Sequence, residues 1–141
     1  MSEDDELNRF AEEMMRKVRD DAIHEADRLI SGKLANSDGD RWRKLLSSEA
    51  ARQAAEALVP EVVDLTLFAL LNAIDNGELP LSWRQSDGSL ISLNDLGHGE
   101  MGGWLMGSPG WRHAFSRERF FDLHSNLKLD LGRYDDNSSS S

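Results

Sequence analysis

One short stretch of the chain carries a glycine pattern typical of phosphate-binding loops. Residues 97–102 read Gly-His-Gly-Glu-Met-Gly, which satisfies G-x-G-x-x-G, and Asp122 follows at the spacing of a ribose-binding acid. A dinucleotide site needs these glycines between a strand and a helix of a βαβ unit. Here Gly103, Gly107 and Pro109 interrupt any such helix, and too little chain remains for a doubly wound sheet. We therefore expect no cofactor.

The histidines are the next candidates for chemistry. His98 and Glu100 have the spacing of the zinc deaminase signature, but that mechanism needs thiolate ligands and the chain has no cysteine. A site of two histidines and one carboxylate would have to be assembled by the fold from separated residues, namely His98, Glu100, His113 and His124. No serine lies in a G-x-S-x-G elbow. We therefore assign no catalytic residue, and whether the chain holds a metal stays open.

Four oxygen-bearing side chains share one face of a predicted helix. Glu61 and Asp64 are three residues apart, as are Asn72 and Asp75. This arrangement partly resembles the one with which all-α pyrophosphohydrolases bind magnesium for nucleotide hydrolysis. The resemblance covers this helix only, and the second glutamate pair that this chemistry needs is absent, because residues 12–13 are followed by no further glutamate in register. It implies an alternative function, that of an all-α, metal-dependent nucleotide phosphohydrolase using the carboxylates of the central helix.

The carboxylates belong to the most aliphatic segment of the chain, residues 60–76, which we predict to be a central helix. Pro60 suits a first helical position, and Asn76 and Gly77 are residues that end helices. At about 100° of rotation per residue, the apolar side chains cover a wide arc. Phe68 lies on the remaining arc among the acidic residues. A helix with so wide an apolar arc needs neighbours on several sides.

The other elements are predicted to pack around this helix. Apolar residues spaced by three or four predict one long amphipathic helix over residues 2–31, with Val18 on its apolar face. A helix over 49–59 precedes Pro60, and Asp87-Gly88 between two short β-compatible runs predicts a hairpin over 79–93. The fold class is therefore mainly α, with one small hairpin.

The end of the chain is predicted to hold short helices, one of them over residues 117–123. Residues 133–141, acidic and then serine-rich, are predicted to be a disordered tail. At 141 residues with 39% hydrophobic residues, the chain fits a single globular domain, which we place at 1–132.

Charge and composition limit the classes of partner that the chain is expected to bind. The formal net charge of −10 disfavours binding to nucleic acid, whose recognition needs Lys and Arg, and favours a basic protein partner. The acidic residues that follow Met1 differ from the basic start of a signal peptide, and no apolar run approaches the length of a bilayer span. We therefore expect a cytoplasmic protein that does not bind membranes. The sequence does not predict its oligomeric state.

These observations lead to one expected function. We expect a non-catalytic acidic protein that binds and inhibits or regulates a basic protein partner, as immunity, antidote or adaptor proteins do. Two surfaces that combine aromatic and polar residues are the expected contacts, because aromatic anchors carry much of an interface's energy. Their residues are Phe68, Glu61, Asp64 and Asp75 on the central helix, and Met101, Trp104 and Trp111 in the glycine-rich segment.

Overall fold

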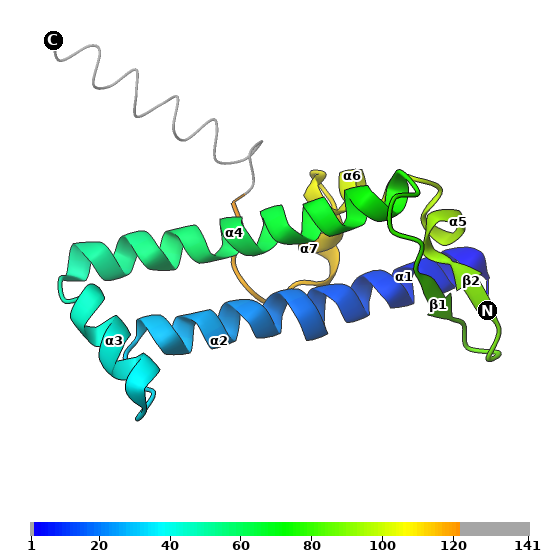
Figure 1. Ribbon diagram of the computed structural model, residues 1–141. Helices are drawn as coiled ribbons and strands as arrows, with labels where there is room; N and C mark the ends of the chain where they lie inside the picture. The colour runs from blue at the N-terminus through cyan, green and yellow to red at the C-terminus, as the bar shows by residue number, and fades with distance from the viewer. Residues whose placement is uncertain (1, 122–141) are drawn as a thin grey trace, which may run out of the picture.

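The computed structural model describes residues 2–121 and shows a long helical hairpin (Figure 1). Its first arm is one continuous helix formed by α1 (Glu3–Glu13), the π-helical segment η1 (Met14–Arg19) and α2 (Asp20–Ile30). The short α3 (Ser37–Leu45) turns the chain at one end. The second arm is α4 (Glu49–Asp75), which returns beside the first. The predicted long N-terminal helix and apolar central helix are both confirmed.

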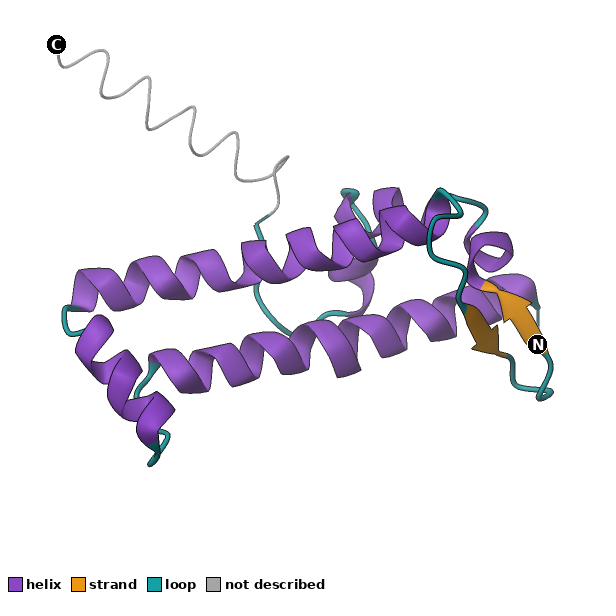
Figure 2. Ribbon diagram, in the orientation of Figure 1, coloured by secondary structure: helices purple, strands orange, loops and turns teal. Residues whose placement is uncertain are grey.

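Smaller elements gather at the other end of the hairpin. Strands β1 (Ser82–Arg84) and β2 (Leu90–Ser92) form one antiparallel pair in which Trp83 lies opposite Ile91. Three short helices follow, α5 (Leu93–Gly97), α6 (Met101–Met106) and α7 (Trp111–Phe115). Figure 2 shows the small sheet beside a fold that is otherwise helical. The predicted hairpin is confirmed, and the fold class is mainly α as expected.

The first arm begins with a capping box. The Ser2 hydroxyl accepts a hydrogen bond from the Asp5 amide, and the Asp5 carboxylate accepts one from the Ser2 amide, both at 3.1 Å. Further along, the π-helical segment widens the turn, so buried residues follow one another at intervals of four: Ala11, Met15, Arg19 and Ile23. The widened turn leaves Val18 exposed, so its predicted place on the apolar face is wrong.

The predicted boundary at Pro60 is also wrong, because α4 continues through it as a single helix of 27 residues. Proline has no N–H, so the carbonyl of Glu56, four residues earlier, loses its helical donor. Arg119 replaces that donor, since its Nη2 lies 2.7 Å from the Glu56 oxygen. A distant side chain therefore hydrogen-bonds the carbonyl that the proline leaves without a helical donor.

The main hydrophobic core fills only one half of the hairpin. It joins α1 and η1 to the second half of α4 and to α5, α6 and α7, through Phe10, Ala11, Met15, Leu67, Leu71, Ile74, Leu93, Leu96, Met101, Leu105 and Trp111. Leu67 is buried, as the wide apolar arc predicted. The other half consists of α2, α3 and the first half of α4, and the short helices α5, α6 and α7 lie outside it (Figure 1).

Residues 116–121 follow α7 as a segment without helix or strand, which we call the strap. The helix predicted for 117–123 is therefore wrong as far as Phe121. The last two residues of that prediction, the domain boundary at 132 and the predicted tail 133–141 lie outside the described residues.

Candidate partner-binding surfaces

Asp64 lies at the centre of a buried ionic cluster. Its Oδ1 accepts a hydrogen bond from Arg19 Nε at 2.6 Å, and its Oδ2 accepts one from Arg112 Nη1 at 3.0 Å. The exposed fractions of Arg19, Asp64 and Arg112 are 0%, 3% and 4%. One carboxylate thus faces two guanidinium groups from other elements, so Asp64 is not on the predicted partner-binding surface.

The strap satisfies most of the remaining donors of this cluster. Arg19 also donates to the Ser116 hydroxyl at 2.8 Å and to the Arg119 carbonyl at 2.9 Å. The Phe120 ring covers the Arg112 guanidinium, with the ring centre 4.8 Å from its carbon. The cluster therefore joins η1, α4, α7 and the strap into one unit. Within residues 2–121, Arg112 Nε is the one buried side-chain polar atom without a hydrogen-bond partner.

Asp75 also has a structural role. Its Oδ1 accepts a hydrogen bond from the Met101 amide at 3.1 Å, and its Oδ2 accepts one from the Gly102 amide at 2.8 Å. These amides begin α6, so the carboxylate at the end of α4 caps the start of the helix that packs against it. An oxygen engaged in this way is not free to bind a partner or a metal.

Of the seven residues predicted in the partner-binding surfaces, three are open to solvent without an interior task, and four are buried or held in interior contacts. Met101 and Trp111 are buried in the core. Asp64 and Asp75 are engaged in the interior contacts described above. Glu61 and Phe68 are exposed on α4, and Trp104 is half-buried on α6. A contact role for these three stays a prediction, and the other four make interior contacts of the fold.

Glu6 is a buried carboxylate that the sequence did not single out. It accepts hydrogen bonds from the Ser86 amide at 2.8 Å, from Arg9 Nη2 at 2.8 Å and from Trp83 Nε1 at 3.2 Å. These bonds, led by that of the Ser86 amide, lower the pKa of Glu6 from 4.5 to about 2. Glu6 thereby fixes the β-hairpin to α1.

The first candidate surface is a set of exposed residues on α4, which we call the α4 face and define as Leu58, Glu61, Val62, Leu65 and Phe68. Leu58 and Leu65 are 56% and 63% exposed, although they belong to the most aliphatic helix of the chain. Beside Leu65 lies a pocket of about 310 Å³ that Met106 and Phe121 also line. Contiguous exposed apolar patches on a protein surface mark interaction sites.

Glu61 is the one charged member of the α4 face. Among the described residues it has no ion pair or hydrogen-bond partner for its carboxylate. Elsewhere on the exposed surface of α4, Glu49 and Glu56 add negative charge, and Arg52 is the one cation of this helix. The surface is therefore apolar and acidic together.

By length and composition alone, α4 would also pass as a membrane span, and 28% of its most apolar window is buried. One such helix is weak evidence for a membrane protein, since core helices of soluble proteins pass the same test. The low burial does show that much of the apolar surface of α4 has no partner within residues 2–121.

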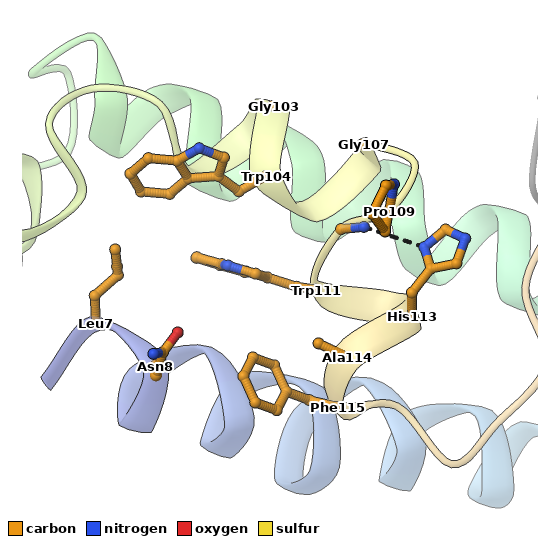
Figure 3. Close-up of a pocket in the computed structure, with 11 residues that line it drawn as sticks. Leu7, Asn8, Gly103, Trp104, Gly107, Pro109, Trp111, His113, Ala114 and Phe115 are labelled. Atoms are coloured by element: carbon orange, nitrogen blue, oxygen red, sulfur yellow. Dashed lines mark hydrogen bonds between the residues drawn. The ribbon is translucent and has the colours of Figure 1, made fainter. Parts of the chain in front are cut away.

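The second candidate surface is a cleft of about 710 Å³ between α1 and the α6–α7 region (Figure 3). We call it the tryptophan cleft. Leu7 and Asn8 line it from α1, and Trp104, Trp111 and Phe115 line it from the opposite side. In Figure 3 the Trp111 ring is seen edge-on between Trp104 and Phe115. The cleft is aromatic with few charges.

Within residues 2–121, no group of three or more histidine and acidic side chains is placed to hold a metal ion. Comparison of the chain with protein-family models found no match. Comparisons with curated proteins and with solved structures also found none.

Proposed function

We propose that this chain is a non-catalytic interaction protein whose α4 face binds a basic amphipathic helix of a protein partner. The observation that carries the proposal is a row of exposed apolar side chains on α4 that contains one unpaired carboxylate, Glu61. The expected consequence of binding is regulation or inhibition of the partner, because the helix it presents would be covered.

The spacing of the α4 face suits a helical ligand. Leu58, Val62, Leu65 and Phe68 follow one another at intervals of three or four, so they form one continuous stripe. From Leu58 to Phe68 the stripe is about 15 Å long at 1.5 Å per residue, which matches about three turns of a partner helix. Two apolar stripes of this kind pack by inserting side chains between one another.

The charges of this chain indicate the sign of the charge that the partner carries. A desolvated Glu61 needs a cation opposite it, and the net charge of −10 attracts basic proteins and repels acidic ones. The same repulsion opposes pairing of the α4 face with a second copy of this chain. A basic helix therefore fits this surface better than a copy does.

The alternative of a metal-dependent phosphohydrolase has less support. It uses the carboxylates of α4, yet Asp64 is held by two arginines and Asp75 by two backbone amides. A magnesium titration followed by calorimetry tests it directly. Saturable binding that disappears in Glu61→Gln would favour the alternative over our proposal.

The proposed function is tested with three designed peptides of 18 residues. The first has a leucine stripe and a lysine face, the second replaces its lysines with glutamates, and the third scrambles the first so that the stripe is lost. Fluorescence anisotropy with labelled peptides should show saturable binding of the lysine peptide only. This binding should weaken as salt rises, because charges near the interface are screened.

Two variants localise the binding. Leu65→Asp should weaken it more than tenfold, whereas Leu90→Asp, an equally exposed leucine on β2, should leave it unchanged. Glu61→Lys should lower the affinity for the lysine peptide and raise that for the glutamate peptide. Equal binding of the scrambled peptide, or full binding by Leu65→Asp, would refute the proposal. Self-association of the wild type that Leu65→Asp abolishes would assign the α4 face to a second copy instead.

A further inference from the structure

We propose that residues 122–131 of this chain cover the α4 face, and that a basic partner displaces them when it binds. Within residues 2–121 the face is open, since Leu58 and Leu65 are 56% and 63% exposed. The covering concerns this chain alone, whereas the displacement rests on the proposed function. The point where the described chain ends, the sequence that follows and its charges each support the assignment.

The described part of the chain ends beside the α4 face. Phe121 is its last residue, and it lines the pocket of about 310 Å³ together with Leu65. Two hydrogen bonds hold the strap in this place. Arg112 Nη1 donates to the Phe121 carbonyl at 3.3 Å, and Arg119 Nη2 donates to the Glu56 carbonyl of α4 at 2.7 Å. The chain therefore leaves the described structure at the edge of the α4 face.

The sequence that follows Phe121 is rich in leucine. Residues 122–131 read Asp-Leu-His-Ser-Asn-Leu-Lys-Leu-Asp-Leu. The four leucines are Leu123, Leu127, Leu129 and Leu131. Moving a leucine side chain from water to an apolar surface is favourable, and the α4 face is the apolar surface that adjoins the start of this segment. The domain boundary predicted at residue 132 likewise places these leucines within the globular domain.

The segment is long enough to cross the face. From Leu65 to Leu58 the axis of α4 runs about 10 Å at about 1.5 Å per residue. Residues 122–131 span about 33 Å as an extended chain and about 15 Å as a helix. Either conformation therefore carries the leucines from Phe121 as far as Leu58. Because the segment is tethered to a residue that is held in place, its effective concentration at the face is on the order of millimolar.

The charges of the segment suit a cover that a partner can displace. Lys128 stands between two of the leucines, so it brings a cation to the unpaired carboxylate of Glu61. Asp122 and Asp130 oppose this attraction, because they add negative charge to a surface that is already acidic. A partner helix with several lysines meets no such repulsion. It therefore competes with the tethered segment for the α4 face.

The test measures how fast a maleimide reacts with one thiol on the α4 face of the full chain. The chain has no cysteine, so Leu65→Cys introduces a single thiol. The rate is compared with that in a serine chain, in which the four leucines of the segment are replaced by serine. The thiol should react at least fivefold faster in the serine chain. Leu90→Cys on β2 is the matched control, because Leu90 is 64% exposed, and its rate should be the same in both chains.

A charge variant tests the same contact without removing a leucine. Lys128→Glu places a second carboxylate near Glu61 and should raise the reaction rate of Leu65→Cys at least twofold. It decides the question if circular dichroism shows that the serine chain fails to fold. Equal rates of Leu65→Cys with and without the substitutions in the segment would overturn the proposal. So would protection that grows with protein concentration, which would assign the cover to a second copy.

Binding of the lysine peptide separates this inference from the proposed function. The serine chain should bind that peptide at least threefold more tightly than the wild type does. If the thiol is protected and neither chain binds the peptide, the cover stands and the proposed function fails. If both chains bind the peptide equally and the thiol rates are equal, the proposed function stands and the cover fails. Equal affinities beside a protected thiol would overturn the displacement.

Discussion

Arg19 Nε and Asp64 Oδ1 lie 2.6 Å apart at the middle of the helical hairpin, where they join its two arms through a buried ion pair. If either side chain left this contact, the other would keep a buried charge that the rest of the cluster pairs only in part. Arg112 of α7 also binds Asp64, and the strap binds Arg19, so the same cluster fixes the position of α7 against α4.

Removing the charge of Asp64 should therefore destabilise the whole fold. Asp64→Asn leaves two buried guanidinium groups without their shared counter-charge, which costs about 3–5 kcal/mol of the free energy of unfolding. Urea denaturation followed by circular dichroism measures this change. The matched control Glu61→Gln, on the exposed side of the same helix, should stay within about 0.5 kcal/mol of the wild type. An unchanged urea midpoint in Asp64→Asn would show that the cluster contributes little.

Glu6 should make part of the stability depend on pH. Its pKa is lowered in the folded protein to about 2 from an ordinary value of 4.5, mainly by the Ser86 amide. A carboxylate with a lowered folded pKa contributes its full stabilisation above pH 4.5 and loses it as the pH falls toward 2. In Glu6→Gln this contribution should be missing at every pH. The stability difference between wild type and Glu6→Gln, measured by urea denaturation, should therefore shrink from pH 6 to pH 3; a constant difference would contradict this role.

Two glycines beside the tryptophan cleft should respond oppositely to alanine. A Cβ at Gly110 would lie 2.4 Å from the Trp104 carbonyl oxygen, so Gly110→Ala must shift the backbone and should destabilise the protein by about 1–3 kcal/mol. A Cβ at Gly103 meets nothing within 4 Å, and this residue lies inside α6. Gly103→Ala should stabilise by about 0.5–1 kcal/mol, because alanine loses less backbone entropy in a helix. Thermal denaturation measures the melting temperature of each variant, which should fall below that of the wild type for Gly110→Ala and rise above it for Gly103→Ala.

Arg119 and Pro60 should be energetically coupled. Arg119→Met removes the donor to the Glu56 carbonyl and should cost about 1 kcal/mol. In a Pro60→Ala background that carbonyl regains a helical N–H, so the same substitution should cost less. The ion pair between Arg119 and Asp27 is lost in both backgrounds and cancels. A double-mutant cycle in urea should give a coupling of about 0.5–1.5 kcal/mol; strict additivity would show that Arg119 does not compensate for the proline.

Features set by local sequence were predictable. The period of the first helix and the Asp87-Gly88 turn depend on residues close in the chain, and the structure shows both elements. The break at Pro60 was predicted wrongly because the group that compensates for it, Arg119, lies 59 residues later. Val18 was misplaced because a π-helical turn changes the period without any sequence signal that we could recognise.

The predicted partner-binding residues agree with the structure only in part, again because some of their contacts are with residues distant in the sequence. Glu61 and Phe68 are exposed, as the angular pattern of α4 suggested. Asp64 has the same residue type as a surface carboxylate, and its burial depends on Arg19 and Arg112, which are distant in sequence. A usable signal did exist, since Asp64 lies three residues before the buried Leu67 and four after the buried Pro60.

The strap also bears on biosynthesis. Arg19 leaves the ribosome early and Asp64 midway, but the acceptors on residues 116–121 emerge only after every helix and strand described here. Until then a nascent chain can pair its two arms, yet its polar centre stays open to water. A product that stops before Ser116 would leave Arg19 without two of its acceptors and should be less stable. In cells a less stable chain is unfolded more often and is degraded more readily. Full stability of the helical hairpin therefore requires that the strap has been synthesised.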